Sequence, residues 1–460
     1  MRLRVGVLVG GLAVVTLATT AFALPVGEAA ALPTASSAGS IATSLPAPIT
    51  GVSSVTGSYY GGCAVFSTGK VDCWGDNLGN GTSSTSSVAV AVKNITNATA
   101  VSTDASSYCA RLSTGRVDCW GPAGFDLGTG SNAPSKVPVA VKNITNAKTL
   151  TSNIDSSYCA LLTTGRVDCW GNNSNGELGN GSTVANSNVP VAVKNITNAT
   201  SVVSDVSGFC ATLLTGGVDC WGDNTFGYLG NGSTVANSNV PVAVKNITNA
   251  KSVSSSNQAV CALLTTGHVD CWGDNSSGAL GNGTTTSSNV PVAVLNITSA
   301  KAVSTTYGIG PDTGFCALLT TGSVTCWGDN SSGELGNGSA VAHSDVPVAV
   351  KNITNATSIG GAKVSDYYCA TLSTGRIDCW GDNSSGELGS GSFVSSSNVP
   401  LVVKGITNAK SVAFEVSNAA AACSVLTAGG VDCWGTETGG LLGNGVSGPN
   451  LWAYAPVAVR

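Results

Sequence analysis

Short apolar runs alternate with polar turns along most of the chain, at a spacing typical of β-strands. Amphipathic helical runs of Leu, Glu and Lys are absent, so we expect an all-β protein. Gly, Asn, Ser and Thr separate the runs, as turns between antiparallel strands require. In one representative stretch, 246–294, the pattern predicts four strands, around 252–254, 260–264, 268–272 and 290–294.

This pattern recurs eight times, with 46 to 55 residues between successive copies. A period near 50 with four strands in each copy predicts a β-propeller of four-stranded antiparallel blades. Eight copies predict eight blades in one closed ring over residues 49–460, because closure removes free sheet edges.

Every copy holds two cysteines in a C-x9-C spacing, which predicts a disulfide across a hairpin. Residues 265–267 suit a three-residue connection with glycine in the left-handed position. Cys261 then opposes Cys271 at a non-hydrogen-bonded pair, where Cα atoms lie about 4.5 Å apart, and Leu263 pairs with Val269. Eight pairs of buried free thiols are the alternative. The predicted disulfides join Cys63 with Cys73, Cys109 with Cys119, Cys159 with Cys169, Cys210 with Cys220, Cys261 with Cys271, Cys316 with Cys326, Cys369 with Cys379, and Cys423 with Cys433.

Two further features of the hairpin bear on packing. The third hairpin position and the residue after the turn vary between copies, so we expect both to be partly exposed. A tryptophan follows the second cysteine in every copy. We expect it to pack between blades, although a ring of tryptophans that binds a sugar or another ligand is the alternative.

Composition excludes several kinds of chemistry. Only 10% of residues are charged and the net charge is −5, so no basic patch for nucleic acid stands out. With two histidines, His268 and His343, zinc binding by the cysteines is not expected. The WGDNSSGELGNG loop lacks the ligand pattern of a calcium-binding EF-hand. No Ser-His-Asp set or separate carboxylate pair is apparent, so we expect no catalytic residues, no metal and no cofactor.

The N-terminus predicts export. Arg2 and Arg4 precede an apolar run with an A-x-A cleavage site at 21–23 or 29–31, so residues 1–31 are interpreted as a signal peptide and 32–48 as a flexible linker. An uncleaved membrane anchor is the alternative, and no later segment is expected to span a membrane. We therefore expect a secreted, disulfide-bonded protein. The N-x-S/T triplets, as at Asn94 and Asn143, matter only in a host that glycosylates them.

The pattern C-A-L-L-x-x-G-x-V-x-C-W-G-x-N-x-x-G-x-L-G, at 159–179, 316–336 and 369–389, resembles the repeat of the regulator of chromosome condensation family. The resemblance covers about residues 49–460 and implies a β-propeller, usually with seven blades. The namesake promotes nucleotide exchange on a small GTPase and contacts chromatin. Secreted bacterial relatives include a propeller that inhibits β-lactamases by protein–protein contact, and the chain is identified as a secreted bacterial-type member.

For function we expect a secreted, monomeric, non-catalytic protein-interaction or adhesion scaffold. Its partner would be a protein or cell-surface ligand bound through loops on one face. An exchange-type regulator of a small GTPase and a propeller hydrolase are the alternatives. Aromatic residues just before the first cysteine either line that face or pack in the core. The loops that differ most between copies supply the candidate binding residues Tyr307, Ile309, Pro311, Asp312, Phe315, Phe414 and Glu415.

Overall fold

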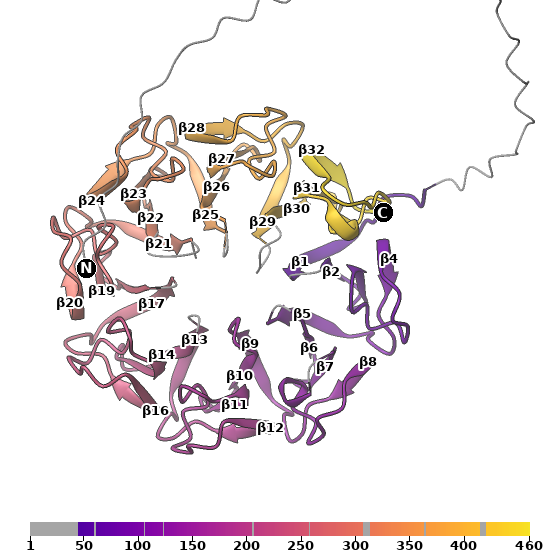
Figure 1. The fold of residues 1–460 in the computed structure, drawn as a ribbon, viewed down its shortest axis with the longest axis horizontal. Coiled ribbons are helices and arrows are strands. Elements are labelled where there is room, and N and C mark those ends of the chain that lie inside the picture. Colours follow the sequence, from indigo (N-terminus) through magenta and orange to yellow (C-terminus); the bar gives the residue numbers. More distant parts are fainter. Residues whose placement is uncertain are drawn as a thin grey trace, which may run out of the picture. The chain divides into compact units, whose positions relative to one another are not determined.

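Eight four-stranded antiparallel sheets form the blades of one ring (Figure 1). The computed structural model describes residues 45–460, except 59, 60, 105, 123, 205, 206, 257, 307–312, 363, 364 and 415–419. The predicted signal peptide and residues 32–44 of the linker lie outside the described residues. Eight blades confirm the count of sequence copies, in place of the seven that the family resemblance implies.

Each blade carries its four strands in chain order, with the first strand next to the middle of the ring (Figure 1). The first strands are β1 (Val52–Ser58), β5 (Ala98–Thr103), β9 (Ala147–Ser152), β13 (Ala199–Ser204), β17 (Ala250–Ser255), β21 (Ala300–Thr305), β25 (Ala356–Gly361) and β29 (Ala409–Phe414). The second strands are β2 (Gly61–Phe66), β6 (Tyr108–Leu112), β10 (Ser157–Leu162), β14 (Gly208–Leu213), β18 (Ala259–Leu264), β22 (Gly314–Leu319), β26 (Tyr367–Leu372) and β30 (Ala421–Leu426).

The outer half of each blade is a second antiparallel pair. The third strands are β3 (Val71–Gly75), β7 (Val117–Gly121), β11 (Val167–Asn172), β15 (Val218–Asp223), β19 (Val269–Gly273), β23 (Val324–Asp329), β27 (Ile377–Asp382) and β31 (Val431–Thr436). The fourth strands are β4 (Ser86–Ala91), β8 (Ser135–Ala140), β12 (Asn186–Ala192), β16 (Asn237–Ala243), β20 (Ser288–Ala293), β24 (His343–Ala349), β28 (Ser396–Val402) and β32 (Trp452–Ala458). Two short 3-10 turns, Phe125–Leu127 and Thr438–Gly440, lie in the loops of blades 2 and 8.

The predicted hairpin register is confirmed. Leu263 pairs with Val269 and Cys261 with Cys271, and Gly267 adopts the left-handed conformation at φ 85°.

All eight predicted disulfides are present, and no described cysteine is left free. Their Cα–Cα distances of 4.0–4.1 Å are shorter than the spacing of about 4.5 Å expected for a non-hydrogen-bonded pair. The bonds indicate a chain that folds in an oxidising environment. They join Cys63 with Cys73, Cys109 with Cys119, Cys159 with Cys169, Cys210 with Cys220, Cys261 with Cys271, Cys316 with Cys326, Cys369 with Cys379, and Cys423 with Cys433.

The hydrophobic core is divided into eight clusters, each between consecutive blades. In one cluster Cys261, Leu263 and Val269 of blade 5 pack with Phe315 and Trp327 of blade 6. The disulfide-bearing face of a blade is therefore a packing surface for the next blade. This corrects the expectation for the third hairpin position, which is buried in every blade except at the half-buried Arg111. The residue after the turn is exposed or half-buried, as expected.

The recurring tryptophan of the repeat is explained by contacts between blades. Each indole Nε1–H donates to a backbone carbonyl in the loop of the preceding blade, at 2.7–2.9 Å, and every indole is at most 1% exposed. The inter-blade packing prediction is thus confirmed. The donor–acceptor pairs are Trp74–Leu441, Trp120–Asn77, Trp170–Asp126, Trp221–Glu177, Trp272–Tyr228, Trp327–Ala279, Trp380–Glu334 and Trp434–Glu387.

A second ring of hydrogen bonds joins the blades near the rim. A glycine N–H in each loop between third and fourth strands donates to a carbonyl near the start of the next blade's fourth strand. Such bonds satisfy loop backbone groups that would otherwise need water. The pairs are Gly81–Lys136, Gly130–Asn188, Gly181–Asn239, Gly232–Asn289, Gly283–Asp345, Gly338–Asn398, Gly391–Tyr454 and Gly445–Ser87.

The links between blades explain the recurring N-I-T triplet. In the link from blade 4 to blade 5, Asn246 is exposed at φ 61° and Ile247 is buried. Asparagine tolerates this left-handed conformation better than most residues, and Gly405 takes the same place before blade 8. The asparagine of the triplet therefore has a structural reason that does not depend on glycosylation.

The two ends of residues 45–460 close the ring without exchanging a strand, since blades 1 and 8 are each contiguous in sequence. Ile49 donates its N–H to Val459, and Val52 donates to Gly429. The Arg460 guanidinium bonds the Pro46 carbonyl at 3.2 Å. Among the described residues, no helix is long and apolar enough to cross a membrane.

Candidate functional site

Most of the loop residues predicted to bind a partner belong to two connections between strands. Tyr307, Ile309, Pro311, Asp312 and Glu415 lie outside the described residues. They belong to the connections between the first and second strands of blades 6 and 8.

Phe315 packs in the core, which is the alternative expected for the aromatic residues before the first cysteine. Its ring is fully buried and stacks on Trp327, with 6.1 Å between ring centroids. Phe414 is half-buried and packs edge-on against Tyr367 at 5.7 Å. The aromatic residues before the first cysteine belong to the core, because each stacks on the tryptophan of its own hairpin at 5.7–6.1 Å, as Tyr108, Tyr158, Phe209, Phe315 and Tyr368 do.

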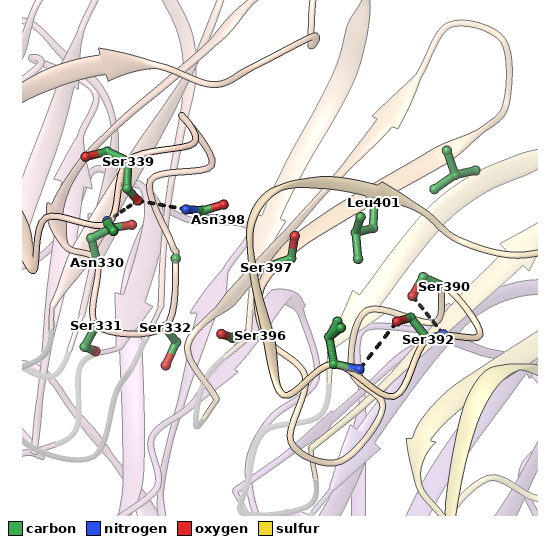
Figure 2. Close-up of a pocket in the computed structure, with 14 residues that line it drawn as sticks. Asn330, Ser331, Ser332, Ser339, Ser390, Ser392, Ser396, Ser397, Asn398 and Leu401 are labelled. Atoms are coloured by element: carbon green, nitrogen blue, oxygen red, sulfur yellow. Dashed lines mark hydrogen bonds between the residues drawn. The ribbon is translucent and has the colours of Figure 1, made fainter.

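A groove of about 790 Å³ opens between blades 6 and 7, and we call it the 6/7 groove (Figure 2). One wall comes from the β23–β24 loop, at 330–333 and 339–340. The other comes from the end of the β27–β28 loop and from β28. Seven serines and two asparagines line it, together with Gly333, Ala340, Val394, Leu401 and Val402. No lining residue is charged.

Hydrogen bonds fix the polar groups at the blade 6 wall. The Asn330 amide donates to the carbonyls of Ser339 (3.3 Å) and Val341 (2.6 Å). From the opposite blade, Asn398 Nδ2 donates to the same Ser339 carbonyl at 3.1 Å, as Figure 2 shows. The described part of the chain offers no hydrogen-bond partner to the hydroxyls of Ser332 and Ser396. Those two hydroxyls therefore remain available to a ligand.

Equivalent junctions carry different side chains. Between blades 3 and 4, asparagines 175, 231 and 237 occupy the places of Ser332, Ser390 and Ser396. A smaller groove of about 540 Å³ between blades 4 and 5 contains Phe226 and Asp274. Another of about 340 Å³ between blades 1 and 2 contains Asp76 and Lys136. Compared with these junctions, the 6/7 groove combines small side chains with the absence of charge.

A buried carboxyl lies behind the blade 6 wall. Glu334 is 2% exposed, and its side chain accepts the backbone N–H of Ser332 at 2.9 Å. Burial raises the pKa of Glu334 to about 8, with a further increase from Asp329. In blade 7 burial likewise raises the pKa of Glu387 to about 8, with Asp382 adding to it. Both groups are therefore largely protonated at neutral pH, and neither places a negative charge behind the groove.

An exposed aromatic residue lies in the blade 7 loop that lines the 6/7 groove. Phe393, between the lining residues Ser392 and Val394, is 81% exposed. Its ring lies 4.6 Å from that of Tyr454 in blade 8. Phe393 stands where blade 3 has a threonine, and Tyr454 stands where blades 3, 4, 5 and 7 have an asparagine. Trp452 is also half exposed, in contrast to the eight tryptophans of the core.

In blade 2 the structure brings together a carboxyl pair that sequence reasoning missed. Asp104 and Asp126 of blade 2 are both fully buried, and burial followed by repulsion from Asp126 raises the pKa of Asp104 well above its usual range. Asp104 accepts the N–H groups of Ser106 and Ser107, so the pair holds a loop and is closed to a substrate. Among the described residues, no group of three or more His, Cys, Asp or Glu side chains is arranged to hold a metal.

The 6/7 groove was also missed, and the signal for it was present. Ser390 and Ser396, which line it, and the exposed Phe393 are departures from other copies of the repeat, visible when the eight copies are aligned with one another. What sequence alone does not show is that residues 330–340 and 390–402 face each other across a blade junction.

Comparison with protein-family models identifies the repeat. Models described as Regulator of chromosome condensation (RCC1) repeat match residues 155–177, 250–279 and 312–334, and also 215–263 and 266–309. Among curated proteins, the E3 ubiquitin-protein ligase HERC2 of Homo sapiens and that of Mus musculus are each 28% identical over 289 residues. The match covers 60% of this chain and only 6% of the length of either relative.

Solved structures share the fold at low sequence identity. Prp20p from Saccharomyces cerevisiae is 18% identical with a TM-score of 0.58, and the match covers 75% of this chain and 85% of Prp20p. Human WBSCR16 is 17% identical with a TM-score of 0.57, over 71% and 86% of the two chains. Yeast RCC1 (Prp20), solved bound to Kap60, gives a TM-score of 0.56 at 18% identity, over 75% and 83%. The chain is therefore an eight-bladed β-propeller in which several repeats match the models of the regulator of chromosome condensation repeat.

Proposed function

We propose that this protein is a secreted, monomeric, non-catalytic scaffold that binds a partner through the loops at one face of the propeller. The proposal rests on the observation that the copies share one framework but differ in the connections between their first and second strands. The hairpins, tryptophans and inter-blade hydrogen bonds repeat around the whole ring. The connections between the first and second strands differ in length. Residues 306–313 join β21 to β22, whereas only 256–258 join β17 to β18. A rigid ring with unequal loops is suited to recognition.

Disulfide bonding supports the secreted location. A buried disulfide in each of eight blades is typical of proteins that fold outside the reducing cytosol. The signal-peptide interpretation of residues 1–31 points the same way. Similar propellers bind proteins, since yeast RCC1 was solved with Kap60 and Prp20p has binding properties to Gsp1p and histones.

Binding to isolated cell envelopes of the producing organism tests the proposal. The exported protein is purified from culture medium, its N-terminus is determined by mass spectrometry, and saturable binding of the labelled protein is measured. A variant in which 306–313 is replaced by the sequence of 256–258 is the informative comparison, because it shortens one loop to a length the fold already uses. We expect saturable binding that the loop variant weakens.

Two results would count against the scaffold. One is an N-terminus that begins at Met1 together with reduced cysteines, which would place the protein in the cytosol. The other is envelope binding that is absent, or that no loop replacement in blades 6 and 8 alters.

A further inference from the structure

The chemistry of the 6/7 groove favours one class of ligand. We propose that this groove binds a neutral glycan chain. The inference rests on the proposed scaffold function and deepens it, because it names a ligand class and a site between the third-to-fourth strand loops of blades 6 and 7. Three properties of the groove support it: its lack of charge, its free hydroxyls and its apolar edge.

The lack of charge argues against most other ligands. None of the fourteen lining residues is Asp, Glu, Lys, Arg or His. Phosphate, sulfate and carboxylate ligands are recognised through cationic side chains, and the groove offers none. Protein interfaces depend on a few buried Trp, Tyr or Arg side chains, and no such residue lines the groove. A neutral molecule with many hydroxyl groups fits this wall better than an ion or a protein.

The polar groups are arranged for such a molecule. A serine hydroxyl both donates and accepts, so it matches a sugar hydroxyl in either role. Ser332 on one wall and Ser396 on the other keep their hydroxyls free among the described residues. Asn330 and Asn398 are held in place by the Ser339 carbonyl between them. Polar groups fixed before binding lose little freedom when a ligand arrives.

The apolar edge completes the site. Sugar rings present C–H faces as well as hydroxyls, and these faces gain from contact with apolar side chains. Leu401 and Val402 of β28 line the groove, and Val402 is 49% exposed. Phe393, between the lining residues Ser392 and Val394, is 81% exposed, and its ring contacts Tyr454 of blade 8. Exposed apolar side chains gathered at one place mark binding surfaces, and an aromatic ring offers a flat surface for a sugar ring.

The groove is open and suits a chain better than a single sugar. Its volume of about 790 Å³ lies in the upper part of the usual range for ligand sites. Related polar grooves between blades 1 and 2 and between blades 4 and 5 are smaller and carry charged residues. The 6/7 groove is therefore the site we assign.

Affinity electrophoresis in gels containing mannan, dextran or xylan tests the inference, with alginate as an anionic control. The full chain with its disulfides intact is used. Ser396→Phe places a ring in the groove, and Asn237→Phe is the matched control at the equivalent position of β16. Phe393→Ala removes the exposed ring between the lining residues Ser392 and Val394. We expect retardation by at least one neutral glycan, none by alginate, an affinity loss of about tenfold or more for Ser396→Phe, and a several-fold loss for Phe393→Ala.

The inference is overturned if no neutral glycan retards the protein more than alginate does. It is also overturned if Ser396→Phe and Asn237→Phe retain the same affinity, because the sugar would then bind elsewhere. Protease treatment of the envelopes distinguishes this failure from that of the scaffold. Loop-dependent binding that is lost on protease treatment, with no glycan binding, would leave the scaffold standing and assign its partner to protein.

Discussion

The junction of blades 3 and 4 and the junction of blades 6 and 7 share one framework and differ in surface chemistry. Trp221 donates to the Glu177 carbonyl and Trp380 to the Glu334 carbonyl, both at 2.8 Å. The glycine-to-strand hydrogen bonds are 2.8 and 2.7 Å. At the rim, asparagines of the first junction become serines in the second, and a threonine becomes Phe393. The framework thus tolerates large changes at the rim, where binding is free to diverge.

The largest effect is expected from the core tryptophans. Trp221→Ala and Trp380→Ala should each lower the free energy of unfolding by about 3–5 kcal/mol, because each removes a buried ring and the hydrogen bond to the preceding blade. Trp452→Ala is the matched control, since Trp452 is 47% exposed, and it should cost less than about 0.5 kcal/mol. Denaturant unfolding of the three variants measures this. Unequal losses of stability at Trp221 and Trp380 would show that the two junctions do not share one framework.

Removal of a disulfide is expected to have the second-largest effect on stability. Replacing Cys369 and Cys379 together with alanine should lower the stability of the ring by about 2–4 kcal/mol, because the unfolded chain regains the freedom of the hairpin loop. The same double replacement at Cys210 and Cys220 should cost a similar amount, since both pairs are buried between blades. Unfolding under non-reducing conditions gives the two values. Stability unchanged in either variant would show that the bridges are dispensable.

The buried glutamate makes the 6/7 junction sensitive to pH. Glu334 has a pKa of about 8 in the fold against an ordinary value of 4.5, so the folded protein binds this proton more tightly than the unfolded chain. The contribution of this bound proton to the free energy of unfolding is fully present below pH 4.5. It is lost as pH rises towards 8, by at most about 1.4 kcal/mol per pH unit.

Glu334→Gln should remove this contribution, because glutamine still accepts the Ser332 N–H and does not ionise. The decline of the unfolding midpoint between about pH 5 and 8 should then be shallower in the variant than in the unaltered protein. Parallel curves would show that Glu334 titrates normally in the fold.

Substitutions in the links between blades should have the smallest effect on the stability of the framework. Asn195 and Asn352 precede blades 4 and 7 at φ 62° and 60°. Asn→Ala at either position should cost about 1 kcal/mol, because alanine disfavours the left-handed conformation, whereas Asn→Gly should be nearly neutral. Unfolding midpoints of the four variants test this. A cost for glycine equal to that for alanine would mean that the asparagine side chain, not the backbone, is needed.

Much of the framework was predictable from spacing alone. The C-x9-C interval with glycine at its turn fixed the register of Cys261 and Cys271, and the recurrence of the Trp-Gly pair indicated packing between blades. Burial of Leu263 was not predicted and that of Phe315 was left open, because the two residues pack together across adjacent blades, far apart in the sequence. The 6/7 groove depends on the same kind of long-range contact. Variation between copies marked it, but only the ring geometry shows that Ser332 and Ser396 share one space.

The most direct test of this account is the glycan affinity of a junction graft. Residues 390–398 are given the sequence of 180–188, which requires Ser390→Asn, Phe393→Thr, Ser395→Ala and Ser396→Asn. All four introduced residue types already occur at the equivalent positions of blade 3, so the stability of the graft should stay within about 0.5 kcal/mol of the starting protein. The account predicts that retardation by the neutral glycan falls about tenfold or more in this equally stable graft. Unchanged retardation would contradict it.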